Sequence, residues 1–156
     1  MAALTDITEN KLIDFLFRGQ ALGIAGASAA AGTGPATLYI GLFTANPTDS
    51  TAGTEVTGGS YARVAVTSSL ANWAGTQSAG STTASSGTGG TTSNNATITF
   101  PAPTANWGVV TGMGLLDAST AGNLLIFSAL TVSKTVNNGD AAPSFAAGAA
   151  TFQIDN

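Results

Sequence analysis

The stretch LYIGLFTANP, residues 38–47, is an apolar run that stops at a turn signal. Side chains alternate between the two faces of a strand, so residues 38–43 would present apolar groups on both faces. A strand that is apolar on both faces is typical of the covered centre of a sheet. Asn46–Pro47 then ends the run. We therefore expect a central strand here, and no residue in it is chemically reactive.

Outward from this strand, the chain repeats short β patterns separated by turn signals. The patterns are YARVAVT (61–67), NATITF (95–100), WGVVTGMGLLD (107–117), NLLIFSALTV (123–132) and AATFQID (149–155), with a tight-turn signal NNGD at 137–140. Gly112 and Gly114 share one strand face, which indicates the close approach of another backbone. Short strands at this spacing predict a mainly β fold, an antiparallel β-sandwich with jelly-roll-like character.

The N-terminal segment is the one convincing helix in the sequence. Asp6 is the expected N-cap, with Glu9 three residues later in a capping-box arrangement, and Gly19 is the expected stop. Apolar side chains fall at helical spacing, namely Leu12, Ile13, Leu16 and Phe17, with Phe15 beside them. Two readings stay open, a helix that packs on its own domain and a helix that docks on a neighbouring subunit.

Two glycine-rich segments divide the chain. Residues 19–36 form an Ala/Gly-rich connector that ends at Gly34–Pro35, so we divide the chain into 1–36, helix and connector, and 37–156, the β-sandwich domain. Residues 75–95 are Gly/Ser/Thr-rich and have the composition of a flexible loop within that domain. The candidate subunit contacts come from the helix and this loop: Leu12, Phe15, Leu16, Phe17, Ser81, Thr82, Thr83, Ser85 and Ser86.

Composition excludes several functions. Charged residues are 8% of the chain and the net charge is −4, while Ser and Thr make up 38 of the 156 residues. The four cationic residues are scattered, so no phosphate-binding stripe forms and nucleic acid is not an expected partner. No run reaches the roughly 20 apolar residues of a membrane span, and Asp14 interrupts the only stretch that resembles a leader. A surface of hydroxyls is cheap to desolvate, which suits a subunit covered by its neighbours.

The sequence offers little catalytic chemistry. It contains neither His nor Cys, so the commonest general base and thiolate chemistry are missing. The carboxylate pairs worth naming are Asp49 with Glu55 and Asp117 with Asp140, all in or beside turns. Only Asp49 and Glu55 are charged in DSTAGTE, too few for a calcium loop. We therefore expect no enzyme, metal or cofactor.

The two tryptophans leave one binding function open. Trp73 and Trp107 both follow the dipeptide Ala-Asn. An exposed aromatic platform on a β-sandwich can bind a sugar, whereas a tryptophan near the start of a strand is more often part of the core. A carbohydrate-binding module is the weaker alternative.

Several longer stretches resemble a family of small virion proteins encoded by tailed bacteriophages. They are ENKLIDFLF, LYIGLFTANPTD with GTEVTGGSYARVAV, and NWGVVTGMGLLDASTAGNLLIFSALTVSKTVNNGD. The resemblance spans most of the chain and departs mainly in the Gly/Ser/Thr segment. Members of such families are described as tail fibre or structural proteins, and the shared motifs are structural rather than catalytic.

The resemblance implies a virion protein without enzymatic activity, assembled in the host cytoplasm. Two roles compete. A capsid cement or decoration protein would contact the major capsid protein and copies of itself, whereas a tail fibre or tail-associated protein would contact tail proteins. The small size and the lack of internal repeats favour the cement role.

Overall fold

The computed structural model describes residues 4–24 and 34–154, which form two compact units. The helix unit comprises Met1–Thr37, Thr67–Thr97 and Phe145–Asn156, and the sheet unit comprises Leu38–Val66 and Ile98–Ser144. The N-terminal helix and the Gly/Ser/Thr-rich loop, far apart in the chain, therefore belong to the same unit. Each unit has its own set of buried side chains.

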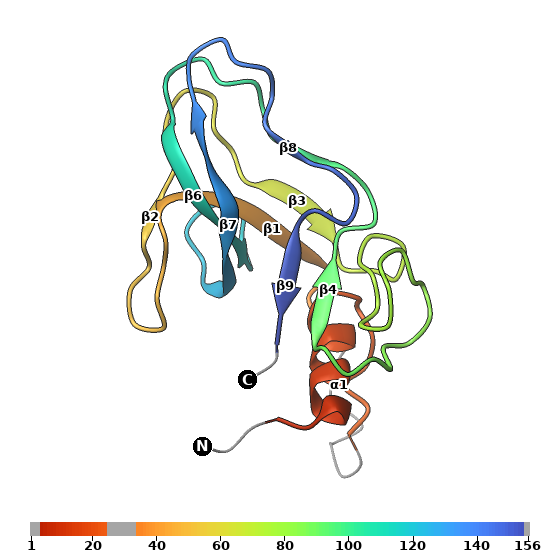
Figure 1. The fold of residues 1–156 in the computed structure, drawn as a ribbon. Helices are drawn as coiled ribbons and strands as arrows, with labels where there is room; N and C mark the ends of the chain where they lie inside the picture. Colours follow the sequence, from red (N-terminus) through yellow and green to blue (C-terminus); the bar gives the residue numbers. More distant parts are fainter. Residues whose placement is uncertain (1–3, 25–33, 155–156) are drawn as a thin grey trace. The chain divides into compact units, whose positions relative to one another are not determined.

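The sheet unit is built on one antiparallel sheet. Its strands are β1 (Thr37–Ala45), β2 (Thr54–Glu55), β3 (Val64–Thr67), β6 (Gly108–Leu116) and β7 (Leu124–Val136). Their order is β2-β1-β6-β7, with β3 also paired to β1 (Figure 1). β1 and β6 run antiparallel with Ile40 opposite Leu115. The expected central strand is confirmed, because β1 has partners on both edges.

Both faces of β1 are covered, as its sequence predicts. Leu38, Ile40 and Leu42 are buried on one face, and Phe43 is buried on the other. On that second face Gly41 stands opposite Gly114. A Cβ at Gly114 would lie 2.7 Å from the Phe43 ring and 2.6 Å from a methyl carbon of Leu124. The expected approach of another backbone at Gly114 is therefore wrong, since side chains fill this space.

Short strands complete the two units. β4 (Thr91–Ser93) pairs antiparallel with β9 (Thr151–Gln153), side by side in Figure 1. β5 (Ile98–Thr99) pairs with β8 (Ser144–Phe145). β4 lies inside the segment expected to be a flexible loop, so that expectation is wrong for residues 91–93. Cross-strand pairing with β9 supplies the order that the local composition lacks.

The helix α1 (Asp6–Leu16) begins one residue earlier than expected. Its N-cap is Thr5, whose side chain makes no capping hydrogen bond, and Asp6 is the first helical residue. The predicted Asp6 cap is therefore wrong, although an acidic residue in the first turn still favours the helix dipole. Gly19 ends the helical course with φ of +65°, and a Cβ there would lie 2.7 Å from the Ser68 carbonyl oxygen.

Aromatic side chains form the core of the helix unit. Phe17, Trp73 and Phe152 are buried and in mutual contact, with ring centroids 5.0 Å apart for Phe17–Trp73 and 5.5 Å for Phe17–Phe152. Ile13, one turn before Phe17, is buried with them. The amphipathic helix thus supplies one side of a core whose other side comes from the loop start and β9.

The predicted fold class is confirmed. The chain is mainly β with antiparallel sheets, and the described residues contain a single helix, at the N-terminal end. Part of the predicted connector, residues 25–33, lies outside the described residues. At its end, Gly34 packs so tightly against the Phe15 carbonyl of α1 that no side chain would fit. No helix in residues 4–24 and 34–154 is long and apolar enough to cross a membrane.

Candidate functional site

A polar stripe runs along the buried side of α1 and its last turn. Asn10, Asp14 and Arg18 follow one another at intervals of four residues, so they lie on one helix face, and all three are buried. Buried charges are stable only when they are paired and hydrogen-bonded. The partners of this stripe are the backbone and hydroxyls of residues 73–87.

Arg18 uses all five of its N–H donors. Nε donates to the Trp73 carbonyl oxygen at 3.2 Å. One terminal nitrogen donates to Asp14 and to Ser85 Oγ, and the other to the carbonyl oxygens of Ser81 and Thr83. Since a guanidinium has five donors in a fixed fork, this side chain has no unused donor and fixes three points of the loop.

Asp14 and Asn10 bind the same loop from the preceding turns. Asp14 accepts from the Ser85 amide at 2.9 Å and from Ser85 Oγ at 2.6 Å. Asn10 donates to the Gly87 carbonyl oxygen at 2.9 Å and accepts from Thr76 Oγ1. The loop is thus held by a polar stripe, which explains how a segment poor in apolar residues takes a defined conformation.

The structure brings the two sets of predicted contact residues into one unit. Among the helix residues, Leu12, Phe15 and Leu16 are half-buried and Phe17 is fully buried in the unit's own core. Among the loop residues, Thr82, Thr83 and Ser86 are exposed, whereas Ser81 and Ser85 are half-buried. Their role as subunit contacts stays a prediction.

Gln77 organises the exposed side of the loop. Its Nε2 donates to Ser81 Oγ at 2.6 Å and to Thr83 Oγ1 at 2.7 Å, and its Oε1 accepts from the Ser86 amide at 3.3 Å. The hydroxyls that face outward therefore stand in a fixed array. The polar stripe and Gln77 were missed from the sequence, although the four-residue spacing of Asn10, Asp14 and Arg18 was a readable signal.

The sheet unit contains a second polar cluster. Arg63 makes a two-pronged contact with Glu55, Nε to Oε1 at 2.8 Å and Nη2 to Oε2 at 2.7 Å. Tyr61 donates to Glu55 Oε1 and accepts from the Leu42 amide of β1. Arg63 also donates to the carbonyl oxygens of Ala118 and Ala121 at 2.7 Å each. The cluster joins β1, β2 and the β6–β7 turn.

The environment of this cluster shifts its ionisation in a definite direction. Burial acts to raise the pKa of the Glu55 carboxyl, but hydrogen bonds from Arg63 and Tyr61 and the charge of Arg63 hold that pKa below its usual value. Burial, with the nearby Glu55 charge, raises the pKa of the Tyr61 hydroxyl. Glu55 thus stays a carboxylate and Tyr61 a neutral hydrogen-bond donor. We call this hydrogen-bonded cluster of Glu55, Tyr61 and Arg63 the Glu55 clasp.

The carboxylates considered for catalysis have structural partners or lie exposed in turns. Glu55 is engaged by Arg63 and is not arranged with Asp49, which is exposed. Asp117 accepts from the Asn123 amide and side chain, and Asp140 accepts from the Asn137 amide at 2.8 Å. Within the described part of the chain, no group of three or more acidic, His or Cys side chains could hold a metal ion.

Both tryptophans belong to the core. Trp73 is fully buried, and Trp107 is 5% exposed with its indole N–H donating to the Gly59 carbonyl oxygen at 2.9 Å. A sugar stacks on an exposed ring face, and neither indole offers one. Their burial agrees with the expectation that a tryptophan near a strand start belongs to the core. Neither ring can then serve as the stacking surface that the carbohydrate-binding alternative requires.

In the described residues, the chain is mainly β and its two buried polar clusters hold its own loops. The chain belongs to the family of the podophage GP4 fiber I protein gp80, whose family model matches residues 3–153. A search of curated proteins finds no match.

The family membership confirms the broader part of the resemblance. The protein is a phage virion structural protein of a fibre-protein family. The family gives no support for a capsid cement role in particular, and the alternative, a tail fibre protein, fits its name better.

Proposed function

We propose that the protein is a non-enzymatic building block of a phage fibre. The observation that carries this proposal is the match of a fibre-protein family model over residues 3–153, nearly the whole chain. The capsid cement role rested on small size and lack of repeats, and a short subunit of a multi-protein fibre has both properties too.

The two polar clusters support a role in assembly rather than in chemistry. Arg18 and Glu55 each have their hydrogen bonds directed to the protein's own backbone and side chains. Such clasps stiffen loops before any partner arrives, which lowers the entropy that docking costs. The exposed hydroxyls of Thr82, Thr83 and Ser86 can be covered at low desolvation cost. The partners are copies of this chain and other tail or fibre proteins.

Fractionation of disrupted particles tests the proposal. Particles are separated into DNA-filled heads and tails with their fibres, and the protein is quantified in each fraction against the major capsid protein. The fibre role predicts enrichment in the tail fraction at a small number of copies per particle. Recovery with heads, at a copy number comparable with the capsid protein, would contradict it and restore the cement role.

Particles that lack the protein give a second readout. A fibre role predicts heads that package DNA and withstand heat or chelator as well as normal heads do, with adsorption to cells reduced. Heads that burst more readily without the protein would show that it stabilises the capsid.

A further inference from the structure

The strand β7 forms one edge of the five-stranded sheet. It spans Leu124–Val136, 13 residues, and within the described residues its only partner is β6. On the far side of β1 the sheet ends in β2 and β3, which are two and four residues long. Short edge strands limit unwanted pairing. β7 is not limited in this way.

The two halves of β7 present different edges. In the second half, four residues, 130–133, stand against the single residue Thr111, because Val110 pairs with Lys134 and Gly112 pairs with Ala129. This large bulge and the charge of Lys134 both make it harder for another strand to pair with this edge of the sheet. Val132, in the bulge, is 79% exposed. The second half is therefore poorly suited to pairing.

The first half has no charge and no large bulge. Its register has one single-residue irregularity, at Leu125, because Leu124 pairs with Leu116 and Ile126 pairs with Leu115. Residues 124–129 read LLIFSA, without charge, proline or glycine, and Phe127 and Ala129 keep a continuous register against Gly114 and Gly112. Leu125 is 38% exposed and Phe127 39% exposed. A six-residue uncharged segment of high β propensity on a free edge is the kind that pairs with an identical strand.

We propose that this edge, residues 124–129, pairs antiparallel with the same edge of a second copy of this chain. A two-fold axis through Phe127 sets that residue opposite its own counterpart and Leu125 opposite Ala129. Cross-strand aromatic pairs of this kind stabilise a sheet. The inference rests on the structure alone and holds whether or not the protein is a fibre subunit.

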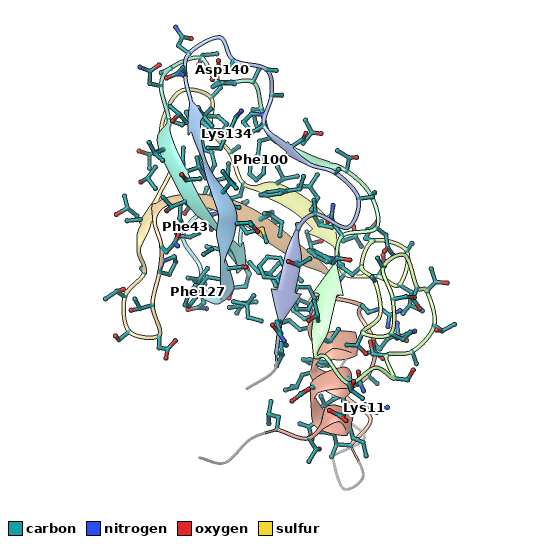
Figure 2. All side chains as sticks on the ribbon, in the orientation of Figure 1. Lys11, Phe43, Phe100, Phe127, Lys134 and Asp140 are labelled. Carbon is teal, nitrogen blue, oxygen red and sulfur yellow. The ribbon has the colours of Figure 1, made fainter. Side chains whose placement is uncertain are left out.

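Charge selects the antiparallel arrangement. Lys134 is the only charged residue of β7 (Figure 2). Parallel pairing in register would set two Lys134 side chains side by side, which is unfavourable. Antiparallel pairing about Phe127 instead carries each Lys134 alongside the turn 117–123 of the other copy, where Asp117 is exposed. The two copies are then complementary at both ends of the shared segment.

The size of the contact sets the conditions of the test. Six residues of strand extend roughly 20 Å, and such an edge buries less than the roughly 1,200 Å² of a stable independent complex. We therefore expect a dimer that depends on protein concentration, and one that repetition within an assembly would strengthen.

Cysteine cross-linking tests the pairing directly, because the chain has no cysteine of its own. Directly opposed Cβ atoms in a sheet are about 4.5–5.5 Å apart, within small adjustment of disulfide geometry. Under mild oxidation at high protein concentration, Phe127→Cys is expected to form a disulfide dimer. A mixture of Leu125→Cys and Ala129→Cys proteins is expected to yield the mixed dimer. Ala65→Cys, exposed on β3 of the same sheet, is the matched control and should stay monomeric.

Each other pattern overturns the proposal. Leu125→Cys linking to itself as readily as Phe127→Cys would indicate parallel pairing. Equal linking of Ala65→Cys would indicate random collision. No dimer at any of the three β7 positions would show that this edge has another occupant or none. Sedimentation adds an independent readout: Phe127→Lys should abolish the concentration-dependent dimer, whereas Ile7→Lys, the same change at an exposed apolar residue of α1, should preserve it.

Discussion

At the residue scale, the helix unit depends on one buried guanidinium. Arg18 is fully buried, and its donors reach Asp14 and four other groups, three of them backbone carbonyl oxygens. A lysine could not replace it, because an ammonium has three donors and no planar fork. Among residues 4–24 and 34–154, Asp14 is the only carboxylate that forms an ion pair with this guanidinium.

Asp14→Asn should therefore destabilise the helix unit strongly. The change keeps the side-chain volume but leaves the buried charge of Arg18 uncompensated, a loss of about 3–5 kcal/mol for buried pairs. Denaturant unfolding would measure the loss, and faster amide exchange in residues 76–87 would locate it. Asp6→Asn, on the exposed first turn of the same helix, should cost less than about 1 kcal/mol. Equal effects of the two changes would refute the role given to Asp14.

The Glu55 clasp predicts a specific dependence on pH. Since the pKa of Glu55 is lower in the folded protein than its ordinary value of 4.5, its contribution is complete above that value. It is lost as the pH falls through the lower folded pKa. Glu55→Gln should lower the free energy of unfolding at neutral pH by about 1–3 kcal/mol and flatten its decline below pH of about 4.5. Asp49→Asn, at an exposed turn, is the control and should leave the decline unchanged.

At the element scale, glycines in β1 and β6 leave room for larger side chains on the sheet face that also carries Phe43. Gly41 and Gly114 stand opposite each other, and the Phe43 ring and Leu124 fill the space beside Gly114. An apolar side chain packed over a glycine thus replaces the packing that the glycine lacks.

Gly114→Ala should disturb this arrangement. The new methyl group would lie under 3 Å from both Phe43 and Leu124, and overpacking of this kind typically costs about 1–3 kcal/mol. Thermal unfolding would show it as a lowered Tm. Gly89→Ala, where no atom lies within 4 Å of the new methyl group, should leave the Tm nearly unchanged. A Tm unaffected by Gly114→Ala would mean that this face repacks freely.

Elements with a strong local signal could be predicted, and those fixed by tertiary contacts could not. β1 and β6 follow from long apolar runs, and α1 follows from apolar spacing. β2, β5 and β8 have two residues each, too few for any period to appear. β4 lies among hydroxyl residues, and only its pairing with β9 makes it a strand.

The candidate site divides in the same way. The sequence located the helix and the loop at 81–86 as regions of interest, but it assigned importance to the apolar side chains of the helix and the hydroxyls of the loop. The structure shows that Asn10, Asp14 and Arg18 join the helix to the loop. Their partners are mostly backbone carbonyl and amide groups 55 to 77 residues away in the sequence, which carry no residue-specific signal in a single sequence.

At the scale of the whole molecule, the chain combines two units that have few charges with one long strand edge, on β7, that has no partner strand within the described residues. Its stability comes from buried aromatic and aliphatic side chains and from two internal clasps, while its exposed loop hydroxyls and β7 remain free to meet neighbours. This division of roles is the one expected of a subunit whose function is to be assembled.

Electron microscopy of particles labelled with an antibody to this protein tests the central claim most directly. If the protein is a building block of a phage fibre, gold particles should lie on the fibres or at the tail, and particles lacking the protein should show no label. Label distributed over the surface of the head would contradict the account and assign the protein to the capsid.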